Sequence, residues 1–187
     1  MKKVSLLLVA VLILSALMTG CGGNESSEEG TLPEEIKIGV FEPLTGANAA
    51  GGELELEGIK LANKLYPEVL GKKVELVVVD NKSDKVEAAT AAARLVEKEK
   101  VSAIIGSWGS SLSMAAGDIV RNAKVPAMGT SCTNPLVTQG NDFYFRVCFI
   151  DPFQGTVMSN YAFNKLGAKK AAIVQEVSND YAVGLAK

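Results

Sequence analysis

The sequence predicts a doubly wound α/β fold, in which a parallel β-sheet carries helices on both of its faces. Two observations support this prediction. Short, nearly continuous apolar runs recur along the chain, which is typical of strands buried on both faces. Most of these runs are followed by apolar residues at helical spacing, as in the crossover helices that join parallel strands. Ligands of such sheets bind in the crevice outside the carboxyl ends of the strands, so the loops there are the candidate site.

The first βαβ unit is clear from periodicity. "IKIGVF" (36–41) is predicted as a strand, and a Gly-rich loop follows it as far as Gly52. "ELELEGIKLANKLY" (53–66) carries apolar residues at helical spacing, and Gly71 closes the unit before the strand "VELVVVD" (74–80).

The remaining elements continue the alternation. Asp84, with Glu87 three residues later, has the pattern of a capping box and predicts an Ala-rich helix that runs to Lys98. Further strands are predicted at 102–106, 125–129, 143–149 and 171–176, with helices at 111–123, 152–166 and from 181 to the end.

The N-terminus has the pattern of an export signal. Two lysines precede the apolar run from Val4 to Met18, which is shorter than the roughly 20 residues that cross a bilayer. Residues 1–20 are therefore predicted to be a signal peptide. The sequence "LMTGC" resembles a bacterial lipobox, which predicts lipid attachment at Cys21; the alternative is a plain secreted protein.

Three further segments are expected after the signal peptide. Residues 21–35 are polar, acidic and rich in Gly and Ser, as in a flexible tether. Residues 36–150 are expected to form a complete lobe, and residues 151–187 a crossover and the start of a second lobe. Because the last helix begins at the very end of the sequence, we expect the chain to be a fragment. The protein is expected outside the cytoplasm, held at the membrane by its lipid.

Composition argues against several classes of function. A net charge of −2 gives no sign of nucleic-acid binding. The chain has no His, which removes the commonest general base and most catalytic zinc sites. It has neither a Gly-x-Gly-x-x-Gly motif after the first strand nor a phosphate-binding loop. We therefore expect no enzyme activity, no cofactor and no metal.

The loop "GSWGSS" between a strand and a helix is the candidate binding site. The backbone N–H groups near Ser110, Ser111 and Leu112 lack intrahelical acceptors, and the helix dipole favours an anion there. The loops at 43–52, 107–111 and 130–134 contain no Lys or Arg, so we expect one small carboxylate, with Thr133 adding a hydroxyl from the last of them. The alternative is that Ser110 or Ser111 merely caps the helix.

Two further features leave alternatives open. Trp108, the sole tryptophan, either packs against an apolar part of a ligand or seals the lobe. Cys132 and Cys148 either pair in an oxidising compartment or are unpaired small core residues, and the second interpretation is favoured.

Several motifs resemble one known family, the extracellular solute-binding proteins of ABC transporters. The resemblance is to the branched-chain amino acid type, relatives of the leucine/isoleucine/valine-binding protein, which have the periplasmic-binding-protein-like type I fold. The motifs that carry it are "IKIGVFEPLTG", "VVVDNKSDKVEAATAAARLVEKEKVSAIIGSWGSS", "VPAMGTSCTNP", "FRVCFIDPFQG" and "YAVGLA". In that family two flavodoxin-like lobes close over the ligand about a hinge.

The resemblance implies a role for individual residues. Ser110 matches the serine that receives the α-carboxylate of the ligand, and Thr133 matches a threonine that shares it. The carbonyl of Ser131 would accept from the α-ammonium, and Tyr181 would reach across the cleft; its alternative is an ordinary core aromatic. Trp108 and Gly109 complete the implied ligand-binding set, which is Trp108, Gly109, Ser110, Ser131, Thr133 and Tyr181.

The sequence also departs from the family pattern. Trp108 stands where leucine-binding relatives carry a smaller apolar residue, and Gly51 replaces a tyrosine, which offsets the added bulk. Ser83 and Gly109 occupy the places of paired cysteines. An acidic residue of the second lobe, which binds the ammonium in relatives, lies beyond this sequence.

The function implied is capture of an amino acid, or a similar small carboxylate, and its delivery to an ABC permease in the membrane. One alternative is a receptor lobe that senses amino acids or amides. The other is an extracellular α/β hydrolase with Ser110 as nucleophile, which would need a base that this sequence does not supply as His.

Overall fold

The computed structural model describes residues 34–187. The predicted signal peptide, Cys21 and nearly all of the predicted tether lie outside the described residues. The described elements are β1 (Glu35–Glu42), α2 (Ala49–Leu65), β2 (Glu68–Val69), β3 (Lys72–Asp80), α3 (Lys85–Ala93), the π-helical turn η1 (Arg94–Lys98), β4 (Ala103–Ile105), α4 (Ser110–Ala123), β5 (Ala127–Gly129), the 3₁₀ turn η2 (Pro135–Val137), β6 (Tyr144–Arg146), α5 (Asp151–Asn164) and α6 (Asp180–Leu185).

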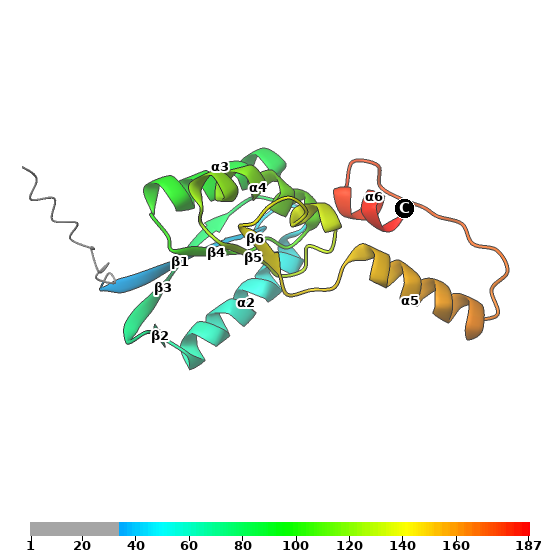
Figure 1. Cartoon of the computed structure of the whole chain (residues 1–187), viewed down its shortest axis with the longest axis horizontal. Coiled ribbons are helices and arrows are strands. Elements are labelled where there is room, and N and C mark those ends of the chain that lie inside the picture. Colours follow the sequence, from blue (N-terminus) through cyan, green and yellow to red (C-terminus); the bar gives the residue numbers. More distant parts are fainter. Residues whose placement is uncertain (1–33) are drawn as a thin grey trace, which may run out of the picture. The chain divides into compact units, whose positions relative to one another are not determined.

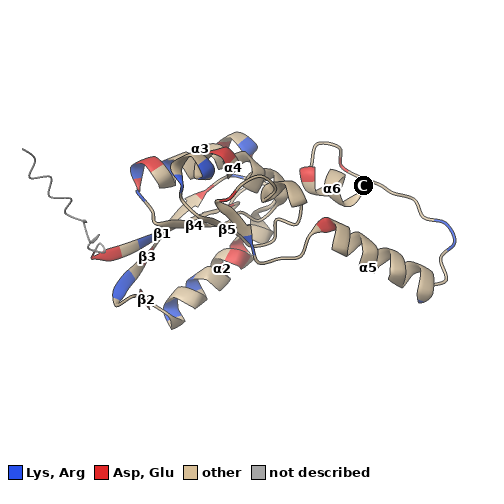
Figure 2. Ribbon diagram, in the orientation of Figure 1, with Lys and Arg blue, Asp and Glu red and all other residues tan. Residues whose placement is uncertain are grey.

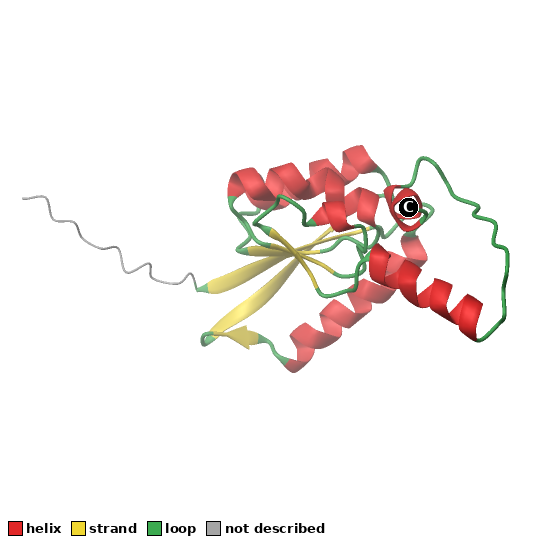
Figure 3. Cartoon of the chain, turned by 45° about the vertical axis from the view of Figure 1, so that its right-hand side comes forward, coloured by secondary structure: helices red, strands yellow, loops and turns green. Residues whose placement is uncertain are grey.

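A six-stranded sheet organises the described part of the chain, with strand order β2-β3-β1-β4-β5-β6. All neighbouring strands pair in parallel except β2 and β3. Helix α2 lies on one face of the sheet, and α3 and α4 lie on the other (Figures 1 and 3). The predicted doubly wound α/β class is thereby confirmed.

The antiparallel edge strand β2 was not predicted. It is joined to β3 by Leu70 and Gly71, which have φ values of 52° and 71°. Two successive residues at positive φ are the geometry of a type I′ turn, which sends the chain straight back in a hairpin. The sheet is therefore mixed, although mostly parallel.

The main hydrophobic core lies between the sheet and the helices α3 and α4. Its buried apolar residues are Phe41, Ala88, Ala91, Ala92, Leu95, Val101, Ile104, Leu112, Ala116, Val120, Ala127, Cys132, Val137 and Tyr144. The alanines of α3 allow this helix to pack close to α4, and the buried residues on both helices recur at helical spacing. This core fixes the start of α4, where the candidate site lies.

The opposite face of the sheet is covered less completely. In α2 only Gly52 and Leu56 are buried, whereas Leu61 and Leu65 are 56% and 63% exposed. Helix α2 also begins at Ala49, earlier than the predicted residue 53, because the predicted Gly-rich loop forms its first turn.

The predicted cap of α3 is present in part. The Asp84 side chain accepts hydrogen bonds from the N–H groups of Val86 and Glu87, as an N-cap residue does. Glu87 does not return the bond that would complete the box, because its carboxylate is paired with Lys82 at 3.3 Å.

The predicted strand at 171–176 is wrong. These residues form no strand, and Ile173 and Val174 are 72% and 98% exposed. A strand needs a hydrogen-bonded neighbour, and no described residue supplies one to this segment. Within residues 34–187 there is no helix with the length and apolar character that spanning a membrane requires.

Candidate functional site

A cavity of about 500 Å³ lies at the carboxyl ends of the parallel strands. All six residues implied as ligand-binding line it: Trp108, Gly109, Ser110, Ser131, Thr133 and Tyr181. The first three follow β4, and the next two follow β5. The structure thus brings together residues as far apart in the sequence as Trp108 and Tyr181. The role of each residue toward a ligand remains a prediction.

The N-terminus of α4 points its first turn toward this cavity, and no side chain caps it. Gly109 is the N-cap residue, with φ 90° and ψ 129°, and no side-chain oxygen accepts from the first turn. The alternative in which Ser110 or Ser111 caps the helix is therefore wrong. The first N–H groups of a helix lack intrahelical acceptors, and together with the helix dipole they favour an anion.

Two hydroxyl groups flank this helix start. Ser110 is 1% exposed, and its Oγ accepts from the N–H of Asn134 at 3.1 Å, which leaves the hydroxyl proton to be donated elsewhere. Thr133 is 7% exposed, and its Oγ1 has no hydrogen-bond partner among the described residues. A buried hydroxyl without a partner is costly unless something else binds it.

The indole of Trp108 lies against Gly51 at the start of α2. A Cβ atom at Gly51 would overlap the indole ring, so the absence of a side chain there makes room for the tryptophan. The predicted compensation between these two departures from the family pattern therefore has a direct steric basis. Trp108 is half-buried and also lines the cavity, so packing in the lobe and contact with a ligand do not exclude each other.

Beneath the loop that carries Trp108 lies a carboxyl group that the sequence analysis missed. Glu42 is completely buried, and its Oε2 accepts from the N–H of Trp108 at 2.6 Å. Burial raises the pKa of Glu42 to about 9, and the nearby carboxyl of Glu55 raises it further, against the lowering effect of the Trp108 N–H. Glu42 could have been singled out because it ends an apolar strand, where a charged residue is unusual.

Helix α6 contacts the first turn of α4 through Asp180. The Oγ of Ser111 accepts from the Asp180 N–H at 3.0 Å, and the Asn134 side-chain amide donates to the Asp180 carbonyl at 2.7 Å. The Lys85 ammonium donates to the Asp180 carboxylate at 2.8 Å, and this hydrogen bond lowers the pKa of Asp180. Of these partners, Ser111 belongs to the predicted binding loop, whereas Lys85 was not singled out by the sequence analysis.

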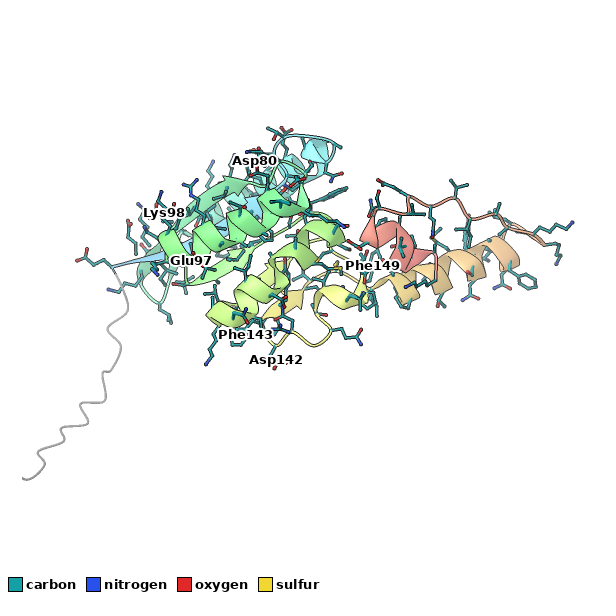
Figure 4. The ribbon with its side chains drawn as sticks, turned by 90° about the horizontal axis from the view of Figure 1, so that it is seen from above. Asp80, Glu97, Lys98, Asp142, Phe143 and Phe149 are labelled. Atoms are coloured by element: carbon teal, nitrogen blue, oxygen red, sulfur yellow. The ribbon has the colours of Figure 1, made fainter. Side chains whose placement is uncertain are left out.

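Phe149 and Gln154 also line the cavity, although the sequence analysis did not name them as site residues. The six-stranded sheet together with α2, α3 and α4 is called the sheet domain below. Phe149, after β6, lines the cavity and lies on the side of the sheet domain where α6 is found (Figure 4). Its ring is 6.2 Å from that of Phe153 at the start of α5. Tyr181, at the start of α6, accepts a hydrogen bond from the Gln154 amide at 3.1 Å. The predicted strand 143–149 includes Phe149, but β6 ends at Arg146, which leaves Phe149 in the segment beyond the strand.

Both described cysteines are free thiols, and Cys132 lies between Ser131 and Thr133 in the loop after β5. Cys132 is buried, and burial raises the pKa of its thiol to about 11. Cys148 is half-buried, and burial raises the pKa of its thiol. The favoured interpretation of unpaired residues is confirmed. Across residues 34–187, no cluster of three or more His, Cys, Asp or Glu residues could hold a metal ion.

Comparison with known proteins places this geometry in context. The family model described as "Periplasmic binding protein" matches residues 35–186. An amino acid binding protein of Pseudomonas aeruginosa is 35% identical over 156 residues, which are 81% of this chain and 41% of that protein.

Two solved structures are similar to the described fold. A leucine binding protein from Thermotoga maritima matches with a TM-score of 0.79 and 50% identity, over 81% of this chain and 43% of that one. The substrate binding protein of a branched-chain amino acid transporter from Streptococcus pneumoniae, in complex with isoleucine, matches with a TM-score of 0.77 and 39% identity, over 81% of this chain and 44% of that one.

The chain thus spans less than half the length of the relatives it matches. The match nevertheless covers almost every described residue, from the first strand to the last helix. The chain belongs to the periplasmic binding protein family.

Proposed function

We propose that the protein is the solute-binding component of an ABC transporter, which captures an amino acid, branched-chain or similar, outside the cytoplasm. The observation that carries this proposal is the uncapped first turn of α4 beside the unpartnered hydroxyl of Thr133, both at one cavity. Similarity to a leucine binding protein and to one crystallised with isoleucine supports an amino acid as the solute.

The ligand carboxylate is proposed to lie at the start of α4. The N–H groups of the first turn and the hydroxyls of Ser110 and Thr133 would donate to it, and each charge-assisted bond contributes about 1.5–3 kcal/mol. The hydroxyl of Ser131 donates to Glu55 at 2.5 Å, so the contribution of Ser131 to the ligand is proposed to be its carbonyl, which would accept from the ammonium. Trp108 would contact the ligand side chain.

Binding is proposed to close two lobes about a hinge, with residues 36–150 on one side and residues from 151 onward on the other. This division of the chain is a prediction. It is supported by Tyr181 and Thr133, which line the same cavity from the two segments. A ligand held from both sides stabilises the closed state by the contacts that it makes only there.

The proposal is tested by calorimetry of the full-length protein with L-leucine and L-isoleucine. Ser110→Ala and Thr133→Ala are each expected to weaken binding by about 1–3 kcal/mol, because each removes a donor to the carboxylate. Ser102→Ala and Thr90→Ala, at exposed positions, are matched controls and should bind as the unaltered protein does. Unchanged affinity in both site variants would refute the site.

The extracytoplasmic location follows from the family, and we propose in addition that the protein is lipid-anchored at Cys21 after removal of residues 1–20. The anchor would keep the binding protein near the permease to which it delivers the solute. Membrane fractionation of cells that express the unaltered protein or Cys21→Ala tests this. The unaltered protein should stay with the membrane and the variant should be released; retention of the variant would contradict the anchor.

A further inference from the structure

Behind the ligand cavity, the carboxyl groups of Glu42 and Glu55 lie near enough that the charge of Glu55 raises the pKa of Glu42. Glu42 is the last residue of β1, and Glu55 lies in α2. Two ionised carboxylates can only accept hydrogen bonds, so a bond between two carboxyls requires a proton on one of them.

The contacts of Glu42 show which oxygen is suited to carry that proton. Its Oε2 accepts from the Trp108 N–H at 2.6 Å, as the carbonyl oxygen of a neutral carboxylic acid would. Its Oε1 is buried and receives no hydrogen bond from any described donor, as expected of a hydroxyl oxygen that donates instead. Glu55 accepts from the hydroxyls of Thr130 and Ser131, as an ionised carboxylate would.

The surroundings of the pair disfavour a second negative charge. The other titratable groups that act on it are Tyr144 from β6, whose charge would repel that of Glu42, and Cys148, whose charge would repel that of Glu55. Within residues 34–187 no Lys or Arg forms a salt bridge with either carboxyl. Arg146, on β6, donates to the carbonyls of the 132–135 loop and to Thr138.

We infer that Glu42 is a protonated positioning residue, which donates to Glu55 and so ties the Trp108 loop to the Ser131 loop in the geometry of the ligand site. The Trp108 N–H bonds to Glu42, and the hydroxyls of Thr130 and Ser131 bond to Glu55, so the inferred bond between the two carboxyls joins the loop after β4 to the loop after β5. The strong upward shift of the Glu42 pKa, caused mainly by burial, agrees with this protonation state at neutral pH. The expected effect of Glu42 on ligand binding rests on the proposed function, whereas the inferred protonation of Glu42 does not depend on it.

The first test needs no ligand. Trp108 is the only tryptophan among residues 1–187, and its backbone N–H binds Glu42, so the part of the fluorescence that is lost in Trp108→Phe reports on the loop. In the full-length protein, titration from pH 6 to 10.5 should show a step centred near pH 9. Glu42→Gln should abolish the step, because the amide accepts from Trp108 and donates to Glu55 at every pH. Glu57→Gln changes an exposed glutamate of α2, the helix that carries Glu55, and should retain the step.

A second readout links the pair to binding. Only the protein in which Glu42 is protonated is expected to bind L-leucine. At pH 10 about a tenth of the protein is in this form, so L-leucine should bind about tenfold more weakly than at pH 7. The ammonium of leucine also titrates in this range, so the informative quantity is the ratio of affinities of the unaltered protein and Glu42→Gln. That ratio should change about tenfold between the two pH values.

The outcomes separate the two proposals. A fluorescence step that survives in Glu42→Gln, or a ratio that stays constant, overturns the inference. If leucine binds at neither pH, the proposed ligand fails while the fluorescence step still decides the protonation state. If Glu42→Gln does not fold, infrared spectra of the unaltered protein at pH 7 and 10 decide: a protonated carboxyl band that is lost at pH 10 supports the pair, and its absence at pH 7 overturns it.

Discussion

The two sides of the cavity are held in different ways. On the side formed by the sheet domain, the loops after β4 and β5 start from buried strands and are fixed by α4, whose inner face is buried. On the other side, α5 has only Asp151 buried, and Phe153, Tyr161 and Phe163 are 59–60% exposed. Figure 2 shows that α5 carries no charged residue after its first one, so its exposure is not that of a polar surface helix.

The difference teaches that an apolar sequence does not by itself make a core. Apolar side chains are stabilised when a second layer removes them from water, and α3 and α4 have that layer in the sheet. Helix α5 and the apolar residues from 171 to 174 have no such layer among the described residues. One side of the cavity is therefore built by packing, and the other mainly by the polar contacts of Asp180.

The sharpest test of this contrast is one substitution made in both regions. Leu95→Ala is expected to lower the free energy of unfolding by about 2–5 kcal/mol, because Leu95 is fully buried in the core. Leu166→Ala, at a residue that is 68% exposed, should change it by less than about 0.5 kcal/mol. Urea unfolding measures both, and equal effects would break the comparison.

The pH dependence of stability tests the buried side a second time. The pKa of Glu42 is about 9 in the folded protein and near 4.5 unfolded, so the folded state binds more protons between these values. Its contribution to stability is thus complete below pH 4.5 and lost as the pH rises to 9, with a slope of at most about 1.4 kcal/mol per pH unit. Unfolding of Glu42→Gln should lack this slope, and an identical slope in the variant would contradict the buried acid.

Two glycines of α2 offer a matched pair, because Gly51 lies against Trp108 and Gly58 faces open space. Gly51→Ala should destabilise the protein by about 1–3 kcal/mol and shift the Trp108 fluorescence, because the new Cβ overlaps the indole. Gly58→Ala meets no atom within 4 Å and should stabilise the helix by about 0.5–1 kcal/mol. Thermal unfolding distinguishes them, and a stabilising Gly51→Ala would show that Trp108 is not held against α2.

The smallest effect is expected from the contact that joins the two sides. Lys85→Ala removes the ion pair with Asp180, but both side chains are partly exposed, so the loss should be at most about 1 kcal/mol. Lys60→Ala, which removes an exposed pair within α2, is the control. Hydrogen exchange at the Asp180 N–H should rise only in Lys85→Ala, and a rise in both variants would show that the pair does not hold α6.

Much of the sheet domain could be predicted from the sequence because its signals are local. Alternation of apolar runs with helical spacing located β1, β3, β4, β5, α3 and α4, and the Gly/Ser/Thr loops after β4 and β5 contain five of the six predicted lining residues. The sixth, Tyr181, was implied by the family resemblance alone. Local signals failed at 171–176, where an apolar run without a neighbouring strand forms no strand. They also failed at β2, because this short edge strand forms only when the two-residue turn at Leu70 and Gly71 folds the chain back against β3.

What the sequence alone determined is the order of the elements and the loops that reach the sheet edge, because periodicity and strand ends are properties of neighbouring residues. Only the tertiary structure decided that Glu42 binds the N–H of Trp108, that Trp108 lies on Gly51, and that Asp180 docks on α4. These pairs are 66, 57 and 69 residues apart in the sequence (108 − 42, 108 − 51 and 180 − 111). Contacts over such separations depend on how the layers pack, which no local pattern encodes.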